Sequence, residues 1–301
     1  MLPLPYKTTA PAKINLGLAV GKKLPNNYHE VKTIYTQIDF FDELMFEASQ
    51  GNTTLSTNHK TLPTDNNNII LQAVARLEKA YLAMFFANPQ PLKIFLKKNI
   101  PVGSGMGGGS SDAAQTLLAL NKIWSLNLSH IELLKISTEL GADVPYQLEG
   151  GVKFETQGTQ AGVFTPLSSL PPLNILICFP DVQKSSFAVF EELDRYRLNQ
   201  PISDNDLTKL INSINAKSPK LIGQHLHNDF ERVLFNSHPE LAKIKETMLA
   251  NNAVGSTVSG TGSTIYGLYT SLQEAKKARS KLITQYPQTV ITRPYEKKKR
   301  N

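Results

Sequence analysis

The residues best suited to chemistry form a glycine-rich segment, residues 101–114, with the sequence PVGSGMGGGSSDAA. Five of the seven residues 103–109 are glycine, which relaxes the steric limits on the backbone so that successive N–H groups can converge on one anion. A helix is predicted to begin directly afterwards, and the unpaired N–H groups at a helix N-terminus favour phosphate. Ser110 and Ser111 add hydroxyl groups there, which can cap the helix, bind phosphate or help to hold Mg²⁺. The segment therefore predicts a phosphate-binding loop.

Two commoner nucleotide motifs do not fit this loop. A P-loop of the form GxxxxGK[ST] requires a lysine before the hydroxyl residue, and none stands here. A GxGxxG pattern occurs at Gly103, Gly105 and Gly108, but a Rossmann fold also requires an acidic residue about 20 positions further on, on a second strand. Glu132 is near that spacing and lies in a predicted helix. A flexible glycine linker is the alternative, and the ordered apolar periodicity on both sides disfavours it.

Length and composition are those of a globular protein. The chain has 301 residues, of which 41% are hydrophobic and 19% charged, enough for two domains or one large one. Its apolar runs fall far short of the roughly 20 residues that a membrane-spanning helix requires. The first ten residues carry no apolar signal core, and the single cysteine, Cys178, cannot form an internal disulfide. We therefore expect a cytoplasmic protein. The net charge of +7 includes four basic residues at 297–300, so it is a weak indication of nucleic-acid binding.

The predicted elements indicate an α+β fold with two domains. In the first half, strands are expected around residues 14–20, 44–48 and 92–96, and helices over residues 68–83, 112–124 and, with a capping box at Ser129 and Glu132, up to Gly141. In the last third, we expect a strand at 173–179, helices around 187–193, 207–214, 221–234 and 239–249, strands at 256–258 and 265–268, a helix capped by Ser271 and Glu274, and a strand at 289–292. This order is that of a split βαβ, ferredoxin-like unit. Prolines at 166, 171 and 172 mark the expected boundary, so that the domains comprise residues 1–165 and 166–301.

The glycine-rich segment resembles the ATP-phosphate loop of the GHMP kinases, a superfamily of small-molecule kinases. On its own it identifies only the superfamily. Further segments extend the resemblance over nearly the whole chain and narrow it to the 4-diphosphocytidyl-2-C-methyl-D-erythritol kinase family. They are PAKINL at 11–16, Tyr28-His29, GADVP at 141–145, NDFE at 228–231 and SGTGS at 259–263. The last of these is either a plain hairpin or, as the resemblance implies, a second backbone cradle.

The resemblance implies an N-terminal domain of the ribosomal-S5-like type, a C-terminal ferredoxin-like domain and an active site in the cleft between them. It implies that ATP, with Mg²⁺, donates its γ-phosphoryl group to the 2-hydroxyl of 4-diphosphocytidyl-2-C-methyl-D-erythritol, a step of the methylerythritol phosphate pathway of isoprenoid biosynthesis. The expected partner is thus a small molecule bearing a cytidine diphosphate, with neither nucleic acid nor a membrane. A monomer or weak homodimer is expected, and the Mg²⁺ ligands are unknown.

The resemblance also implies two catalytic residues. Asp143 would take the proton from the accepting hydroxyl, and Lys13 would pair with Asp143 and stabilise the charge on the transferring phosphoryl group. The alternatives are a turn or capping aspartate and an exposed strand lysine. Val144 and Pro145, which follow Asp143, are predicted to be extended.

For the substrate, the resemblance implies that Tyr28 stacks on the cytosine and that His29 hydrogen-bonds its edge. Asn15 and Ser186 are expected to contact the polyol and the diphosphate. Phe190 corresponds to a second stacking aromatic, and a core phenylalanine at helical spacing is the alternative.

The ATP site is expected to comprise the loop, with Asn68 and Lys98 on the adenine side. The loop residues are Pro101, Val102, Gly103, Ser104, Gly105, Met106, Gly107, Gly108, Gly109, Ser110 and Ser111. One departure from the family concerns the substrate loop, where Asn27 stands in place of the usual glycine before Tyr28. Asparagine also adopts left-handed backbone angles, although less freely than glycine.

Three other functions compete with this interpretation. One is another GHMP kinase that acts on a phosphorylated or free polyol, and the Tyr28-His29 pair disfavours it. A second is a non-catalytic nucleotide or sugar sensor on the same fold, against which the presence of both Lys13 and Asp143 argues. A third, an RNA-binding protein, rests only on the basic residues 297–300 and on fold analogy.

Overall fold

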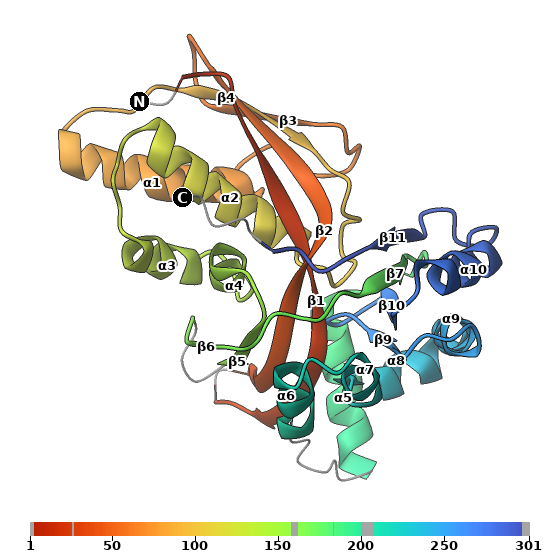
Figure 1. Ribbon diagram of the computed structural model, residues 1–301. Coiled ribbons are helices and arrows are strands. Elements are labelled where there is room, and N and C mark those ends of the chain that lie inside the picture. The colour runs from red at the N-terminus through yellow and green to blue at the C-terminus, as the bar shows by residue number, and fades with distance from the viewer. Residues whose placement is uncertain (1–2, 26, 158–161, 183, 200–206, 297–301) are drawn as a thin grey trace. The chain divides into compact units, whose positions relative to one another are not determined.

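The computed structural model describes residues 3–25, 27–157, 162–182, 184–199 and 207–296 (Figure 1). The chain forms two compact units, each built of helices and β-strands. The first comprises residues 1–12, 40–102 and 107–149, and the second comprises residues 13–39, 103–106 and 150–301. The long strands β1 (Tyr6–Lys23) and β2 (His29–Ala48) contribute residues to both units, as does the glycine-rich loop.

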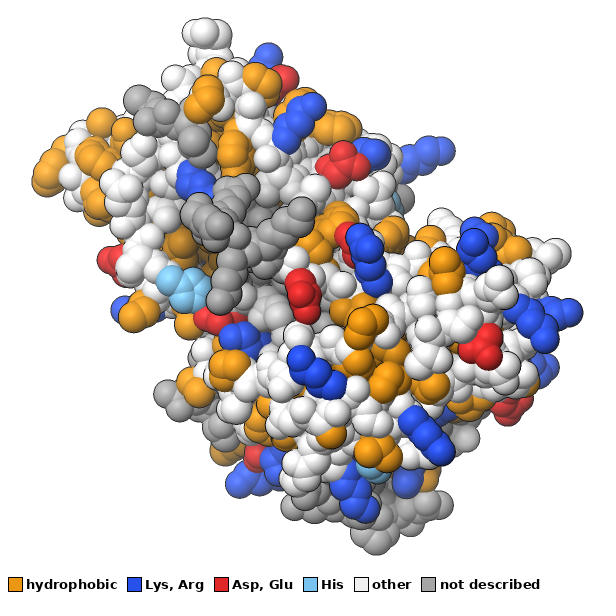
Figure 2. All heavy atoms as spheres, viewed as in Figure 1, with side chains coloured by type: hydrophobic (Ala, Val, Ile, Leu, Met, Phe, Trp, Pro, Cys, Tyr) orange, Lys and Arg blue, Asp and Glu red, His pale blue; other side chains and the backbone are white. Residues whose placement is uncertain are grey.

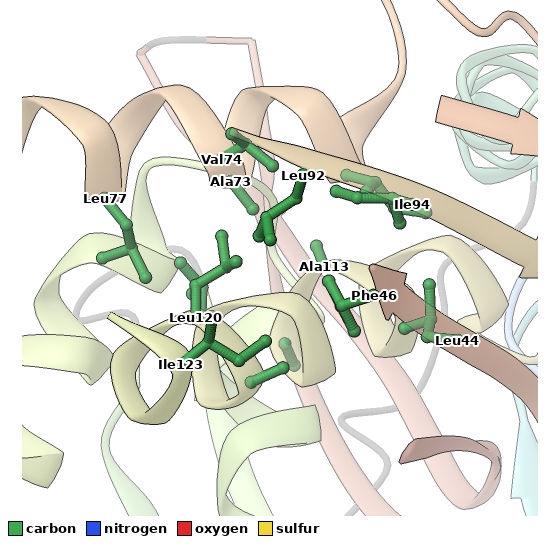
Figure 3. Packing of buried hydrophobic residues seen from close by; sticks show 14 of the residues in the cluster. Leu44, Phe46, Ala73, Val74, Leu77, Leu92, Ile94, Ala113, Leu120 and Ile123 are labelled. Carbon is green, nitrogen blue, oxygen red and sulfur yellow. The ribbon is translucent and has the colours of Figure 1, made fainter. Parts of the chain in front are cut away.

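In the first unit, β2 pairs antiparallel with β4 (Leu92–Lys97), and β3 (Thr54–Thr57) pairs parallel with β4. Four helices follow in chain order: α1 (Ile69–Phe85), α2 (Gly108–Ile123), α3 (His130–Thr138) and α4 (Val144–Glu149). Buried side chains of the helices and strands point toward one another in one core (Figure 3). They include Ala73, Val74 and Leu77 from α1, Ala113, Leu120 and Ile123 from α2, Leu44 and Phe46 from β2, and Leu92 and Ile94 from β4.

Local signals explain where these helices begin. The Asn68 side chain accepts a hydrogen bond from the Ile70 N–H, and therefore caps α1. The capping box predicted at Ser129 and Glu132 is confirmed at the start of α3. The apolar positions of α1 recur at helical spacing, which is why one face of the helix is buried in the core.

The second unit contains an antiparallel sheet in the order β11–β7–β10–β9. Its strands are β7 (Asn174–Cys178), β9 (Gly255–Val258), β10 (Ile265–Tyr269) and β11 (Val290–Thr292). Helices α9 (Pro239–Ala250) and α10 (Leu272–Leu282) contribute to the same core as these strands. The sequence order strand, helices, two strands, helix, strand is the split βαβ order that the sequence predicts.

Elsewhere in this unit, β2 pairs with β5 (Lys153–Gln157) and β5 pairs with β6 (Phe164–Pro166), both antiparallel. Strand β1 pairs parallel with the short β8 (His227–Asn228). The remaining helices are α5 (Ser186–Asn199), α6 (Thr208–Asn215), α7 (Pro219–Gln224) and α8 (Glu231–Ser237). The α+β fold with helices and two sheets is thus confirmed, and the boundary after residue 165 stays a prediction.

Four local predictions were wrong. The single helix expected over residues 221–234 is divided into α7, β8 and α8, because pairing of β8 with β1 overrides the helical periodicity. Val144 and Pro145 begin α4 rather than an extended segment, since the first turn of a helix tolerates a residue without an N–H. Helix α2 begins at Gly108, four residues before the predicted start at Asp112. Ser271 precedes α10 without a side-chain capping bond.

Candidate functional site

The glycine-rich loop has the backbone conformation of an anion cradle. Gly103, Gly105 and Gly107 have φ angles of 70°, 78° and 63°, in the left-handed region that glycine adopts without steric cost. Alternation of such residues with others turns successive N–H groups to one side. Gly107 is also the N-cap of α2, whose first-turn N–H groups have no acceptor within the helix. The loop therefore presents backbone donors in the manner that phosphate requires.

The turn between β9 and β10 holds one part of this loop. The Ser259 hydroxyl donates to the Gly105 carbonyl at 3.0 Å, and the Thr264 N–H donates to the Ser104 carbonyl at 3.4 Å. A Cβ atom at Gly105 would lie 2.2 Å from the Ser259 carbonyl oxygen and 2.8 Å from that of Gly262. The SGTGS turn is therefore a hairpin connection that also packs against the first glycine loop.

Lys13 lies in the buried middle of β1 and is 3% exposed, unlike an exposed strand lysine. Its Nζ donates to Asn15 Oδ1 at 2.6 Å and lies 5.6 Å from the centre of the Tyr35 ring. Its backbone N–H donates to the Met106 carbonyl at 3.0 Å, so β1 contacts the glycine loop directly. Asn15 is itself held, since its amide donates to Thr33 Oγ1 at 2.7 Å. The structure therefore brings Lys13, Asn15 and the loop together.

Asp143 lies directly before α4 in the first unit. Its carbonyl accepts the Gln147 N–H at 3.1 Å, the first hydrogen bond of that helix, so Asp143 occupies the N-cap position. One turn further, Gln147 Nε2 donates to the Gly107 carbonyl at 3.4 Å. Helix α4 is thus joined to the N-terminus of α2, which places Asp143 one helical turn from a residue that contacts the N-cap of α2.

The two residues expected on the adenine side both have partners in the fold. The Asn68 amide donates to the Pro63 carbonyl at 2.7 Å while its oxygen caps α1. Lys98 Nζ lies between two buried carboxylates, 2.5 Å from Asp42 Oδ2 and 2.7 Å from Asp112 Oδ2. A contact of either residue with adenine stays a prediction.

Lys98, Asp42 and Asp112 form a buried triad in which burial and the neighbouring charges shift the pKa values of Lys98 and Asp112. Burial alone lowers the pKa of Lys98, but the carboxylates of Asp112 and Asp42 raise it above its ordinary value. Burial, together with the charge of Asp42, raises the pKa of Asp112 to about 8 despite the opposing effect of Lys98. Burial therefore favours the protonated form of Asp112.

This shift predicts a pH dependence of stability. The folded chain keeps the Asp112 proton up to a pH of about 8, whereas the unfolded chain loses it near the ordinary value of about 4. The stabilisation from this proton is complete below that lower value and is lost as the pH rises through the higher one. We expect the free energy of unfolding of the wild type to fall, relative to Asp112→Asn, by up to about 1.4 kcal/mol per pH unit across this window. Urea denaturation at several pH values measures the difference, and parallel pH profiles would contradict it.

The residues expected to bind cytidine lie around the start of β2. Tyr28 is 73% exposed, while the ring of His29 is buried. The His29 ring stacks on Phe190 of α5, with centroids 5.0 Å apart and planes 18° apart, and its Nε2 lies 2.8 Å from Asp194 Oδ1. Asn27 has a φ of 64°, so asparagine adopts here a left-handed backbone conformation that glycine would adopt more freely.

Phe190 is half-buried, and its ring also packs edge-to-face with that of Phe230, with centroids 4.9 Å apart. It therefore has the packing of a core residue, and a stacking role toward the base stays a prediction. Ser186, at the first position of α5, lies with its hydroxyl 2.9 Å from that of Thr261 in the SGTGS turn.

Sequence reasoning missed the three acidic residues Asp42, Asp112 and Asp194. Asp42 lies between Phe41 and Glu43 on β2, and because its neighbour Glu43 is also acidic, no local pattern distinguishes it as the buried ion-pair partner. Asp112 lies within the quoted glycine motif, but its partner is 14 residues away. Asp194 has no local signal, since it meets His29 across 165 residues of sequence.

Larger features of the described chain are also relevant to function. No helix in the described ranges is long and apolar enough to cross a membrane. Among the same residues, His, Cys, Asp and Glu do not gather in groups of three or more that could hold a metal ion. On the face shown in Figure 2, the described Lys and Arg side chains are scattered among acidic and hydrophobic ones rather than gathered in a stripe.

Comparison with known proteins agrees with the geometry of the loop. Residues 68–151 match the GHMP kinases N terminal domain, and residues 210–288 match GHMP kinases C terminal. The 4-diphosphocytidyl-2-C-methyl-D-erythritol kinase of Caldicellulosiruptor bescii is 36% identical over 287 residues, which cover 95% of this chain and 97% of the relative. The enzyme of that name from Clostridioides difficile is 34% identical over 288 residues, covering 95% and 94%.

Solved structures give the same result. A crystal structure of 4-(cytidine 5'-diphospho)-2C-methyl-D-erythritol kinase matches with a TM-score of 0.78 and 27% identity, covering 97% of this chain and all of the other. The L. major mevalonate kinase shares the fold, with a TM-score of 0.74 and 18% identity over 97% of this chain and 98% of the other. The expected GHMP fold is therefore confirmed, and the chain belongs to the 4-diphosphocytidyl-2-C-methyl-D-erythritol kinase family of the GHMP kinases.

Proposed function

We propose that this chain is an ATP-dependent kinase that phosphorylates the 2-hydroxyl of 4-diphosphocytidyl-2-C-methyl-D-erythritol. The single observation that carries the proposal is the glycine loop, whose left-handed residues open directly onto the N-terminus of α2. The names of the curated relatives supply the acceptor. The exposed ring of Tyr28 and the neighbouring His29 ring, whose Nε2 lies 2.8 Å from Asp194 Oδ1, fit a nucleotide-bearing acceptor better than a simple alcohol.

The loop supplies the electrostatic part of the reaction. Backbone N–H groups of the loop and of the first turn of α2 bind the phosphate oxygens, where the positive end of the helix dipole stabilises their charge. Lys13, buried and oriented by Asn15, is the cation for the transferring phosphoryl group. Asp143 is the group that accepts the proton of the attacking hydroxyl, late in a loose transition state.

Mg²⁺ accompanies ATP in reactions of this type, and the helix N-terminus has an oxygen that suits it. The hydroxyl of Ser111 is fully buried and has no hydrogen-bond partner among the described residues. A hydroxyl oxygen is a ligand that Mg²⁺ accepts together with phosphate oxygens and water. Ser111 would therefore hold the ion, which when bound neutralises charge on the β- and γ-phosphates.

Tyr28 is the proposed stacking platform for the cytosine base. Because base–aromatic stacking contributes about 1–3 kcal/mol, Tyr28→Ala is expected to raise the KM of the acceptor roughly tenfold or more and to leave the KM of ATP within about twofold. Steady-state kinetics with each substrate varied in turn measures both constants. Tyr28→Phe, which retains the ring, is the matched control and should stay near wild type. Equal changes in both KM values would remove the cytidine assignment.

A coupled ADP-release assay tests the proposed function itself. With purified chain, ATP and Mg²⁺, we expect turnover with 4-diphosphocytidyl-2-C-methyl-D-erythritol and only background with galactose, homoserine or mevalonate. Preference for one of the other alcohols would identify a different GHMP kinase. Absence of turnover with every acceptor, in a chain that still binds ATP, would support a nucleotide sensor.

A further inference from the structure

One buried ion triad joins the two ends of the glycine loop. Asp42, on β2, accepts the backbone N–H groups of Asn99 at 2.6 Å and Ile100 at 2.8 Å through its Oδ1. These residues directly precede the loop. Its other oxygen lies 2.5 Å from Lys98 Nζ, which reaches Asp112 Oδ2 of α2 at 2.7 Å. The segment that enters the loop is therefore connected to the helix that follows the loop through a chain of contacts from Asp42 to Lys98 to Asp112.

The first residue of α2 leaves room for this connection. A Cβ atom at Gly108 would lie 2.9 Å from Lys98 Nζ and 3.0 Å from Cγ2 of Ile100. The lysine head thus lies against the backbone at the start of the helix, where any side chain would displace it. No such close approach exists at Gly109, the third glycine of the GGG run, where a Cβ would meet nothing closer than 3.9 Å. Glycine at 108 is therefore favoured by the close approach of Lys98 and Ile100 rather than by backbone angles.

The burial of the triad separates it from an ordinary surface ion pair. The side chains of Lys98, Asp42 and Asp112 are 4%, 0% and 2% exposed. The neighbouring Lys97 pairs with Glu43 at 2.8 Å, but both side chains are half exposed, and such pairs contribute little. Buried ion pairs are poor sources of stability compared with apolar packing, and the best-supported reason to keep one is that it specifies a single arrangement.

We propose that Lys98, with Asp42 and Asp112, is a positioning residue that fixes the spacing between the two ends of the phosphate loop before ATP binds. The inference rests on the proposed function, because it treats the loop as the ATP-phosphate site. With the ends fixed, the backbone N–H groups of residues 102–107 are already ordered, and less binding energy is lost in ordering them. Without the connection, only part of the population is competent to bind, and the apparent affinity falls by that fraction.

Asp112→Leu is the informative variant, because leucine has nearly the shape of aspartate and removes the acceptor without leaving an unpaired anion. We expect the dissociation constants of ATP and of inorganic tripolyphosphate to rise together, by roughly tenfold or more, as measured by titration calorimetry. Amide hydrogen exchange of residues 102–107 in the ligand-free protein should accelerate. Asp112→Asn, whose carbonyl still accepts from Lys98, is expected to restore both properties, and Lys97→Met is the matched control with no effect on either.

Three outcomes would overturn the inference. They are wild-type tripolyphosphate affinity in folded Asp112→Leu, unchanged exchange of the loop amides, or weakening confined to ATP with tripolyphosphate unaffected. The last outcome would assign Lys98 to the adenine base instead. If Asp112→Leu does not fold, the double variant Lys98→Met/Asp112→Leu removes the buried ammonium together with its acceptor on α2 and leaves Asp42 with its backbone donors Asn99 and Ile100, and the same measurements apply.

Failure of the proposed function gives a different result. A wild-type chain that binds neither ATP nor tripolyphosphate would refute the function, while hydrogen exchange of the loop would still test the positioning role. A wild-type chain that binds ATP but does not phosphorylate the cytidine-diphosphate acceptor would leave the positioning inference intact.

Discussion

Asp143→Asn and Lys13→Ala are each expected to lower turnover by roughly a hundredfold or more. In the proposed mechanism, Asp143 accepts the proton of the attacking hydroxyl, and asparagine cannot. Lys13 is a buried ammonium that Asn15 orients, so its loss removes a fixed positive charge that no solvent ion replaces with the same geometry. Both effects belong to the transition state, and we expect them in kcat, with the two KM values changed by less than about threefold.

Two features of the structure make these variants interpretable. Asparagine is as good an N-cap as aspartate, so Asp143→Asn should preserve the start of α4. Lys22, on the same strand as Lys13 but exposed, provides a matched control, and Lys22→Ala should leave turnover unchanged. The measurement is the steady-state rate of ADP release by variants whose circular dichroism matches the wild type. Turnover within a few fold of wild type in either folded variant would remove that residue from the mechanism.

Gly105→Ala is expected to be the most damaging substitution in the glycine loop, with a fall in kcat/KM for ATP of roughly a hundredfold. Gly105 has a φ of 78°, and a Cβ there would lie 2.2 Å from the carbonyl oxygen of Ser259. The nearest atoms, the carbonyl oxygens of Ser259 and Gly262, belong to the backbone and not to flexible side chains. The loop backbone must therefore move away from the SGTGS turn. Displacing the phosphate-binding amides by about 1 Å is enough for an effect of this size.

Gly103→Ala separates the collision from the backbone strain. Gly103 has a similar φ of 70°, but a Cβ there would meet nothing within 4 Å. Alanine at Gly103 should therefore cost only the left-handed strain, about 1–2 kcal/mol. Thermal melting and kinetics with varied ATP compare the two variants. Similar losses in both would show that packing of the loop against the turn is unimportant.

The sequence determined those parts of this protein that depend on neighbours along the chain. The glycine loop requires backbone angles that only glycine adopts freely, and Gly103, Gly105 and Gly107 have them. Helices α1 and α3 of the first unit follow from apolar periodicity and from short-range caps, such as the box at Ser129. Asn27 has a left-handed backbone angle, which asparagine adopts more readily than most residues other than glycine.

Only the tertiary structure decided which distant side chains meet, because their contacts depend on strand pairing and helix packing that no local pattern encodes. Lys98 reaches Asp42 across 56 residues of sequence, and His29 reaches Asp194 across 165. Pairing of β8 with β1 likewise divided a segment whose apolar spacing indicated one helix. The sequence thus specified the conformation of the glycine loop, whereas packing specified which buried charges meet beside it, because charges taken out of water must be paired.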